Sequence, residues 1–463
     1  MEPIGFAPGP PSGRLALARF GPPAEGIAGR RLLVRATPPD PADPAALRAA
    51  GAALASALAR HRRAAVDATG LPAAALAELA AGAWLRFPAP DLRTRPAEPP
   101  WRLARLTFHT AVYPAAEAAW AEHLPGVRGA RLAIGLATRP PNRLTPKRLA
   151  ARLAALAGVE AEILKPAAMR RQGFGALLAA ARGSANPPRL VVLRRRGAFR
   201  ARPLVLVGKG VTFDSGGLCL KPAADMHELK ADLGGAAAIA GCMQALAGRA
   251  SPAPVVAVLG LIENMPGSRA QRPGDVTRAA DGSTIEIIDT DAEGRLVLAD
   301  CLAWARRTFD PVAIVDLATL TGANVVALGG RRAGLFASDA ALAAAIAAAG
   351  RAVAEPVWPM PLDPAYARAL ESPIADIRHC SPERFQPDAC QAAAFLHRFA
   401  GATPWAHLDI AGMEWRSAAE DPWPAGATGY GARLLDRLVA TRFEDPAGWP
   451  DRDRPGARAR RRR

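Results

Sequence analysis

Two glycine-rich segments carry most of the side chains in this sequence that could do chemistry. The first is VGKGVTFDSGGLCLKPAADMHELKADLGG at 207–235, and the second is DTDAEGRL at 289–296. Their charged residues include Asp214, Asp225, Asp232, Asp289, Asp291 and Glu293, together with Lys209, Lys221 and Arg295. Carboxylates from several loops can hold two divalent ions, with one or two carboxylates bridging them. The glycines let the backbone turn sharply and approach a ligand.

Helix capping is the alternative explanation for part of this pattern. Asp291 and Glu293 stand where a helix is expected to begin, and a carboxylate is favourable there in any protein. For one such residue we would prefer that explanation. Two dense clusters beside the ends of apolar strands favour a metal site instead, and the site has no HExxH motif or nearby histidine pair.

Lysine is rare in this chain but concentrated in the first segment. Only five of the 59 basic residues are lysines, and Lys209, Lys221 and Lys230 fall within that segment. Arginine stays protonated in proteins, whereas lysine can become a neutral amine and bind a metal ion. The clustering indicates chemistry that arginine cannot supply, although three residues can also cluster by chance.

The elements around these segments indicate an α/β fold. Apolar runs at 190–195, 203–210, 255–262, 284–289 and 312–320 are typical of buried strands, and segments 234–250 and 293–307 of helices. This alternation predicts a catalytic domain with a mixed, largely parallel central sheet flanked by helices. In such sheets the ligand site lies beyond the carboxyl ends of the strands, where both charged segments fall.

The chain divides by composition into three parts. A length of 463 residues suggests two or three domains. Residues 1–135 form a smaller N-terminal α/β domain with helical stretches at 41–66 and 72–87 and without a chemical motif. A catalytic domain follows at 136–450, with Thr145 as helix cap and Pro146 at the first helical position. Residues 451–463 are an arginine-rich tail that we expect to be disordered.

Composition also limits the class of protein. No apolar run is long enough for a membrane helix, and the N-terminus does not resemble a secretory signal. Five cysteines without CxxC spacing favour reduced thiols, so we expect a cytoplasmic protein. The formal charge of +17 permits nucleic-acid binding, but the few scattered aromatics offer no stacking platform.

The charged segments resemble a known family. VGKGVTFDSGGLCLKP and DTDAEGRL are similar to the two signatures of the leucyl aminopeptidase (cytosol aminopeptidase) family of two-metal exopeptidases. Further matches follow in the same order: ENMPGSRAQRPGDV at 263–276, DLATLTGA at 316–323, HLDIAGMEW at 407–415 and GATGYGARLL at 426–435. The resemblance covers roughly residues 136–440 and implies a metallo-aminopeptidase acting on short peptides.

By this resemblance, five residues correspond to the metal ligands of the family: Lys209, Asp214, Asp232, Asp291 and Glu293. The tighter ion would use Lys209, Asp214, Asp232 and Glu293. The exchangeable ion would use Asp214, Glu293 and Asp291, the last through both its side chain and its carbonyl. Lys209 would then be a neutral amine. The ions expected are Mn²⁺ or Zn²⁺, with Mg²⁺ and Co²⁺ as alternatives.

The resemblance also implies catalytic and substrate-binding residues. Lys221 corresponds to the lysine that stabilises the oxyanion, and Arg295 to the arginine that holds a bicarbonate ion as proton shuttle. Thr319, Leu320 and Gly322 correspond to the loop lining the first substrate pocket. Leu229 would form an apolar wall of that pocket, which predicts broad selectivity with a preference for leucine-like N-terminal residues.

Several alternatives and departures stay open. Asp289 stands where the family usually has Asn, and segment 378–396 replaces a glycine-rich stretch near subunit contacts and the site entrance. The activity could be narrower, as in a dipeptidase for Cys-Gly. A DNA-binding accessory role is the alternative from another class of function. DNA binding through phosphate contacts would weaken steeply as the salt concentration rises. The third alternative is a degenerate, inactive homologue that serves as a structural subunit, but every ligand position is intact. The resemblance also implies a homohexamer.

Overall fold

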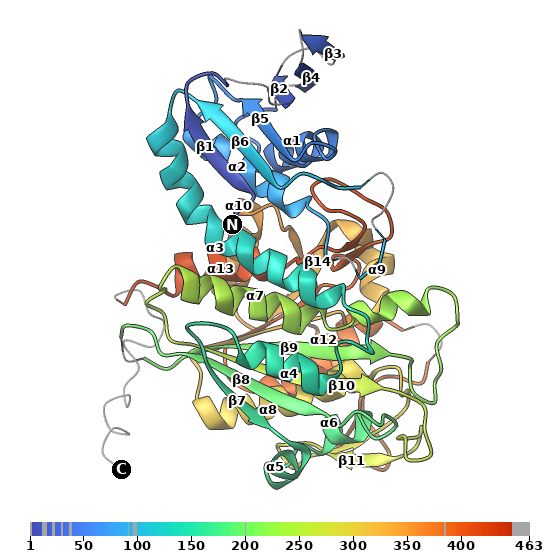
Figure 1. Cartoon of the computed structure of the whole chain (residues 1–463). Helices are drawn as coiled ribbons and strands as arrows, with labels where there is room; N and C mark the ends of the chain where they lie inside the picture. Colours follow the sequence, from blue (N-terminus) through green and yellow to red (C-terminus); the bar gives the residue numbers. More distant parts are fainter. Residues whose placement is uncertain are drawn as a thin grey trace.

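The computed structural model describes residues 2–11, 16–20, 24–28, 31–36, 39–90, 92–95, 100–199, 201–383 and 386–446. The arginine-rich tail at 451–463 lies outside them. The described chain forms a smaller N-terminal lobe and a larger lobe that carries both charged segments (Figure 1). No helix in these ranges combines the length and apolar character needed to span a bilayer. The five cysteines are free thiols.

Within the described residues, the N-terminal lobe is an α/β unit built on a six-stranded sheet. In spatial order its strands are β1 (Ile4–Pro8), β6 (Arg105–Thr110), β5 (Arg63–Asp67), β2 (Ala16–Phe20), β4 (Arg31–Ala36) and β3 (Ala24–Ala28). Helices α1 (Pro44–Ala57), α2 (Ala73–Leu85) and the first half of α3 (Tyr113–Ala137) cover it. Their alanines and leucines form a core separate from that of the larger lobe.

The first helical stretch is shorter than the expectation of 41–66. Helix α1 ends at Ala57, and residues 63–67 form strand β5 in the middle of the sheet. The apolar residues Ala64, Ala65 and Val66 are all buried between neighbouring strands. Tertiary pairing therefore overrides the helix propensity of an alanine-rich segment.

The larger lobe is organised by an eight-stranded mixed sheet within the described ranges. Its strands, in spatial order, are β15 (Val357–Pro359), β14 (Ala333–Ala337), β17 (Trp405–Asp409), β13 (Ala313–Ala318), β9 (Leu204–Asp214), β10 (Val255–Asn264), β8 (Arg189–Arg195) and β7 (Glu160–Leu164). The four strands from β17 to β10 run parallel. This confirms the expected α/β class with a mixed central sheet.

The central strands are continuous apolar runs. Because successive side chains point to opposite sides of a strand, such runs make both faces of the sheet apolar. Leu204 and Leu206 of β9 join one core, and Val205 and Val207 join the other. The first core contains α4 (Pro146–Ala154), α7 (Gly234–Gly248), α10 (Ala340–Ala352), α13 (Ala432–Arg442) and the end of α3. The second contains α5 (Pro166–Arg171), α6 (Gly175–Ala180), α8 (Glu293–Phe309) and α12 (Asp388–Ala400).

Small sheets and short helices complete this lobe. A three-stranded sheet contains β11 (Val276–Arg278), β12 (Thr284–Glu286) and β16 (Ile377–Arg378), and a hairpin pairs β18 (Trp415–Arg416) with β19 (Gly426–Ala427). The short helices are η1 (Met226–Ala231), α9 (Gly322–Leu328), η2 (Gly329–Arg331) and α11 (Pro364–Arg368). The strand expected at 284–289 is thus only three residues long and lies outside the central sheet.

Helix α3 connects the two lobes. Its residues Ala116 and Trp120 pack in the N-terminal core, whereas Ala133 and Leu136 pack in the larger lobe. The boundary expected between residues 135 and 136 falls near the end of this continuous helix. The division into domains at that point stays a prediction.

Helices α3 and α7 cross at two glycines. A Cβ added to Gly129 would lie 2.3 Å from the carbonyl oxygen of Gly241, so Gly129→Ala must push the helices apart. We expect it to destabilise the fold by about 1–3 kcal/mol, as overpacking does, and to lower the urea midpoint of unfolding.

The matched control lies on the same helix. A Cβ added to Gly135 meets nothing within 4 Å, so Gly135→Ala should leave stability unchanged or raise it by about 0.5–1 kcal/mol through helix propensity. Equal midpoints for Gly129→Ala and the unaltered protein would contradict the close crossing.

Candidate metal centre

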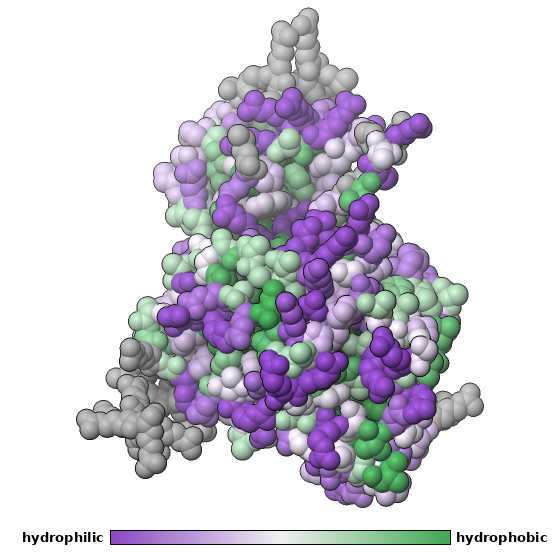
Figure 2. All heavy atoms as spheres, turned by 60° about the horizontal axis from the view of Figure 1, so that its bottom comes forward, coloured by the Kyte–Doolittle hydropathy of each residue, from purple (hydrophilic) through white to green (hydrophobic). Residues whose placement is uncertain are grey.

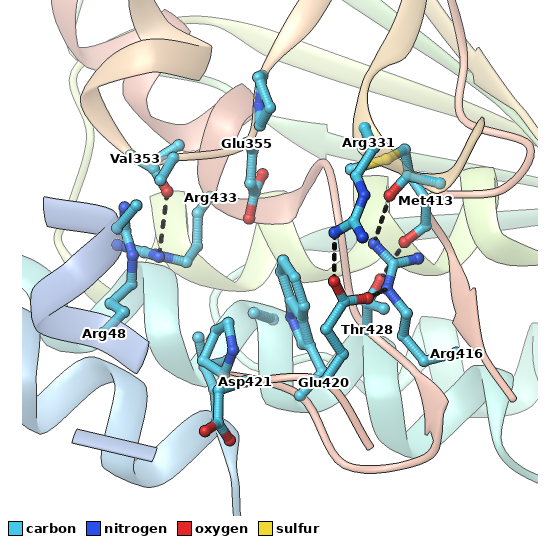
Figure 3. Close-up of a pocket in the computed structure, with 18 residues that line it drawn as sticks. Arg48, Arg331, Val353, Glu355, Met413, Arg416, Glu420, Asp421, Thr428 and Arg433 are labelled. Carbon is cyan, nitrogen blue, oxygen red and sulfur yellow. Dashed lines mark hydrogen bonds and ion pairs between the residues drawn. The ribbon is translucent and has the colours of Figure 1, made fainter. Parts of the chain in front are cut away.

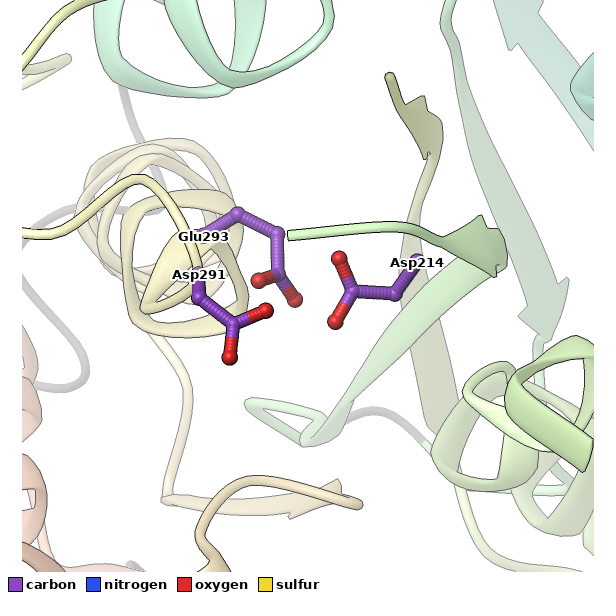
Figure 4. A group of neighbouring side chains, drawn as sticks. All are labelled: Asp214, Asp291 and Glu293. Carbon is purple, nitrogen blue, oxygen red and sulfur yellow. The ribbon is translucent and has the colours of Figure 1, made fainter. Parts of the chain in front are cut away.

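Carboxylates from separate segments meet beyond the carboxyl ends of the central strands. Asp214 is the last residue of β9, and Glu293 is the first residue of α8. Asp291 precedes α8 by two residues. The side chains of these three residues point toward one another (Figure 4), and each can offer an oxygen within 4.8 Å of the others. Such a group of oxygens is the type of site that divalent metal ions occupy in proteins.

Lys209 connects this group to a fourth carboxylate. Its Nζ lies 2.8 Å from Asp232 Oδ1 and 2.9 Å from Glu293 Oε1, and it donates to the carbonyl oxygen of Thr319 at 2.8 Å. Burial by itself lowers the pKa of Lys209, but the charges of Asp232 and Glu293 outweigh burial and hold that pKa above its ordinary value. In this arrangement Lys209 is an ammonium that neutralises two carboxylates.

Lys221 neutralises the other pair of carboxylates. Its Nζ lies 3.0 Å from Asp214 Oδ2 and 2.5 Å from Asp291 Oδ1. Burial again lowers the pKa of this lysine, and the charges of Asp214 and Asp291 raise it by more. The predicted oxyanion-stabilising lysine therefore lies directly beside the predicted ligands, in the loop that follows Asp214 and in contact with Asp291 of the second segment.

Two lysines do not satisfy all the oxygens of these four carboxylates. Among the described residues, Asp232 Oδ2 and Glu293 Oε2 are buried and accept no hydrogen bond. Burial, together with the charge of Asp214, raises the pKa of Asp291 to about 7, and burial is also the main cause of the raised pKa of Glu293. Buried acceptors without partners are costly, so this excess of negative oxygens fits divalent cations.

Asn264 and Thr290 hold the cluster in place. Asn264 Nδ2 donates to Asp214 Oδ1 at 2.9 Å and to the carbonyl oxygen of Thr290 at 3.0 Å. Thr290 Oγ1 in turn donates to the carbonyl of Gly216 at 2.7 Å. Both polar residues are buried. The sequence analysis did not identify either one, although Asn264 lies in the 263–276 match and Thr290 between two predicted site residues.

Gly216 is required where the first loop passes the second. Its φ of +88° lies in the left-handed region, and an added Cβ would lie 2.8 Å from Asp291 Oδ1. A larger residue would therefore displace a carboxylate of the cluster, which explains the glycine at this position.

The residues expected to line the substrate pocket lie at different distances from the cluster. Thr319 Oγ1 donates to Asp232 Oδ1 at 2.6 Å, so Thr319 directly contacts a predicted ligand. Leu320 donates its N–H to Asp409 Oδ1 at 3.1 Å, and Gly322 begins α9 with open space around it. Leu229 is half-buried on η1, which leads to Asp232.

Asp409, which the sequence analysis did not select, orders the loop that follows β13. Besides Leu320, it accepts hydrogen bonds from Ala411 N at 3.1 Å and Thr321 Oγ1 at 2.7 Å. Nearby, His407 Nδ1 lies 2.6 Å from Asp316 Oδ1, and both side chains are fully buried. His407 is thus a core residue, consistent with the interpretation that it is structural.

Arg295 forms an ion pair with a residue of the divergent segment 378–396. Its Nη2 donates to Asp388 Oδ1 at 2.7 Å, and its Nη1 donates to the carbonyl of His379 at 3.0 Å. Burial and the charge of Arg295 lower the pKa of His379 to about 4, which keeps that ring neutral. The arginine expected to hold bicarbonate therefore already has a carboxylate partner within the chain.

Asp289 is part of a turn and not of the carboxylate group. Its Oδ1 accepts the N–H of Asp291 at 2.9 Å, and its carbonyl oxygen lies 2.7 Å from His379 Nε2. Asp225 has a left-handed backbone and is exposed. Of the acidic residues in the two segments, only Asp214, Asp232, Asp291 and Glu293 contact the two lysines in the described chain.

A separate cavity of about 200 Å³ lies where the two lobes meet (Figure 3). None of the predicted site residues is among the described residues that line it. Its charged groups largely pair with one another or with backbone: Glu420 pairs with Arg331 and Arg416, and Arg433 donates to the carbonyl of Val353. The carboxylate cluster, and not this cavity, carries the candidate chemistry.

The geometry defines a class of protein, namely an α/β enzyme with a candidate metal centre made of carboxylates and lysines. Comparison with known proteins gives the family. The catalytic domain of the cytosol aminopeptidase family matches residues 131–436. This chain belongs to the cytosol aminopeptidase family and is a metal-dependent aminopeptidase.

Individual relatives agree with this assignment. A probable cytosol aminopeptidase of Gluconobacter oxydans is 49% identical over 337 residues, which cover 72% of this chain and 68% of the relative. One from Methylorubrum extorquens is 45% identical over 393 residues, covering 83% and 79%. The solved structure of the bottromycin maturation enzyme BotP in complex with Mn superposes with a TM-score of 0.82 at 36% identity, covering 92% of this chain and 98% of BotP.

The hydrogen bonds of Asn264 generate a prediction about metal affinity. Asn264→Ala removes the donor that orients Asp214, and loss of such a supporting contact typically weakens metal binding about 10–100-fold. Isothermal titration of the metal-free protein with Mn²⁺ measures this affinity. Asn142→Ala, at an exposed position, is the control and should bind Mn²⁺ like the unaltered protein. Equal affinities for both variants would show that Asn264 does not position the ligands.

Proposed function

We propose that this aminopeptidase uses two divalent ions to remove N-terminal residues from short peptides. The observation that supports the proposal most directly is the pair of buried oxygens, Asp232 Oδ2 and Glu293 Oε2, that accept no hydrogen bond in the described chain. They lie on the same carboxylates that Lys209 contacts. One ammonium thus serves two carboxylates and leaves acceptors for a further cation.

The carboxylates form two lysine-centred groups, one around Lys209 and the other around Lys221. These two groups support the assignment of ligands to two ions. Lys209, Asp232 and Glu293 would hold the tighter ion together with Asp214, and Asp291 would hold the exchangeable ion with Asp214 and Glu293. Bound ions would activate a water molecule and polarise the scissile carbonyl. Lys209 would have to release its proton to become a ligand, and the nearby cations would favour that release.

Lys221 is positioned to stabilise negative charge that develops on the substrate. In the metal-free arrangement its ammonium is shared by Asp214 and Asp291. With cations on those carboxylates, the ammonium would be free to donate to the oxygen of the scissile carbonyl. Thr319, which contacts Asp232, would keep that ligand oriented at the entrance of the first substrate pocket.

Leu229 supports acceptance of apolar N-terminal side chains. It is half-buried on η1, which leads directly to Asp232. One apolar wall discriminates weakly between aliphatic side chains, by about 10–200-fold for a single methylene. We therefore propose broad selectivity that includes leucine.

We propose that both ions are Mn²⁺ or Zn²⁺. Mg²⁺ and Co²⁺ are alternatives, because oxygen-rich ligands also accept them. The relative BotP was solved with Mn, which favours Mn²⁺. Measured metal content of the purified protein will decide this point.

A homohexamer in the cytoplasm is the proposed state of the protein. The surface in Figure 2 is largely hydrophilic but is interrupted by apolar areas. Leu220 is 60% exposed and Val326 is 90% exposed in the isolated chain, and subunit contacts would cover such side chains. Light scattering of the purified protein measures the assembly.

The role of Lys221 gives the main test of the proposed function. Metal-loaded protein should hydrolyse leucine p-nitroanilide and Leu-Gly, and metal-free protein should not. Lys221→Ala should lower kcat by about 10²–10³-fold, the usual effect of losing an oxyanion donor. The exposed Lys165→Ala is the control and should keep full activity. Full activity of Lys221→Ala with both ions bound would refute the role.

The contact between Arg295 and Asp388 generates a second test, which concerns bicarbonate. Because Asp388 already supplies a carboxylate to Arg295, we expect added bicarbonate to leave the rate of the unaltered protein unchanged. Asp388→Ala should lose activity by up to about 10²-fold, within the range of general acid–base effects, and should regain it with bicarbonate. Glu371→Ala, at an exposed position, is the control. Stimulation of the unaltered protein by bicarbonate would show that the free ion still binds.

A further inference from the structure

Glu414 lies beside the metal centre but belongs to neither lysine-centred group. It follows β17 in the chain and immediately precedes β18. A Cβ added to Gly234 would lie 3.2 Å from Glu414 Cβ and 3.3 Å from Thr319 Cγ2, so these two side chains flank the same point at the start of α7. Gly234 is two residues beyond Asp232. Glu414 is therefore a near neighbour of the predicted ligand Asp232 and of the pocket residue Thr319.

The segment that follows Glu414 packs against η1, which carries the pocket wall. Lys230 Nζ lies 5.4 Å from the centroid of the Trp415 ring, and Ser417 Oγ lies 3.5 Å from Glu228 Oε2. Leu229 stands between these two contacts in the sequence. Glu414 and Leu229 therefore lie on adjacent elements at the same side of the metal centre.

The carboxylate of Glu414 forms no ion pair within the described residues. In the part of the chain that the structure describes, no lysine, arginine or histidine nitrogen is within 4.0 Å of its oxygens, and its Oε2 is buried without a hydrogen-bond donor. Burial raises the pKa of Glu414 to about 7 and the charge of Asp409 adds to this effect, whereas the backbone N–H groups of Glu414 and Gly412 and the charge of Arg416 oppose it. Such an acceptor is costly to the folded protein, and a cationic partner from outside the chain would remove that cost.

We propose that Glu414 determines specificity for the N-terminal side chain of the substrate and extends the range of this pocket to lysine and arginine. The proposal rests on the proposed aminopeptidase function. Lysine and arginine combine an apolar stem with a terminal charge. The stem would lie on Leu229, where leucine also fits, and the charged group would donate to Glu414.

The test compares substrates of matched length. We would measure kcat/KM for the p-nitroanilides of lysine, norleucine and leucine with metal-loaded protein, because norleucine has the stem of lysine without its charge. We expect the unaltered protein to favour lysine over norleucine by about 10–100-fold, the range for a hydrogen bond to a charged group. Glu414→Gln should abolish this preference and leave leucine hydrolysis intact.

Two further variants make the result specific. Glu228→Gln removes one negative charge from the adjacent element and should keep the lysine preference, which excludes a general effect of charge. Glu414→Met is the second pocket variant, and it should act like Glu414→Gln on lysine while favouring norleucine. An unchanged lysine-to-norleucine ratio in both Glu414 variants, with leucine still cleaved, would overturn the proposal.

A binding measurement separates this proposal from the proposed function. Calorimetric titration with lysinamide and norleucinamide reports selectivity even if no substrate is hydrolysed. Selective binding of lysinamide that is lost in Glu414→Gln, without hydrolysis, would support the role of Glu414 and refute the peptidase activity. Equal affinity for the two amides in the unaltered protein would refute the role of Glu414.

Discussion

The structure of the site depends on the attraction between buried carboxylates and two lysine ammonium groups. Lys209 comes from the middle of a central strand, and its Nζ contacts groups from three other segments: Asp232 after η1, Glu293 at the start of α8 and Thr319 after β13. The contact with Thr319 requires strands β9 and β13 to end at the same edge of the sheet, as parallel neighbours do. Because isolated buried charges are very costly, the charge balance at this edge constrains the packing of every element that reaches it.

The sheet meets this constraint through its parallel central strands. Strand β9 is buried on both faces, so its backbone position is determined by two cores and not by the site. Asn264, at the end of the neighbouring strand β10, then orients both Asp214 and the segment before α8. A rigid apolar framework thus carries a polar cluster whose oxygens are not satisfied by the chain, which is the arrangement expected of a preorganised metal site.

Residues that match the family pattern and residues that depart from it lie at different distances from the proposed ions. The residues proposed to hold the ions are of the types that the resemblance assigns to the metal ligands. The differences lie one layer outward, where Asp388 pairs with Arg295 and Glu414 lies beside Thr319. Both are carboxylates from the C-terminal half of the catalytic domain. We expect them to leave the proposed metal ligands in place and to alter the charge that a substrate or an auxiliary anion meets.

The sequence by itself determined the chemistry of the cluster and the class of the fold. The proposed ligand positions are local in sequence, within 207–235 and 289–296, and a strand that is buried on both faces can be recognised as a short continuous apolar run. The start of α4 at Pro146 after Thr145 was also predictable because helix starts depend on adjacent residues. Where a competing long-range contact decided, the sequence was insufficient, as for residues 63–67, which join a strand in place of a helix.

Only the tertiary structure decided which distant residues serve the cluster. Asn264 reaches Asp214 across 50 positions in the chain, and Arg295 reaches Asp388 across 93. Neither partner has a local pattern, because a hydrogen-bond donor or a single carboxylate is equally compatible with an exposed loop. Glu414 likewise becomes informative only when its position beside Thr319 and the lack of an ion pair in the described chain are seen together. Strand order and loop packing bring these groups together, and neither is a property of any short segment.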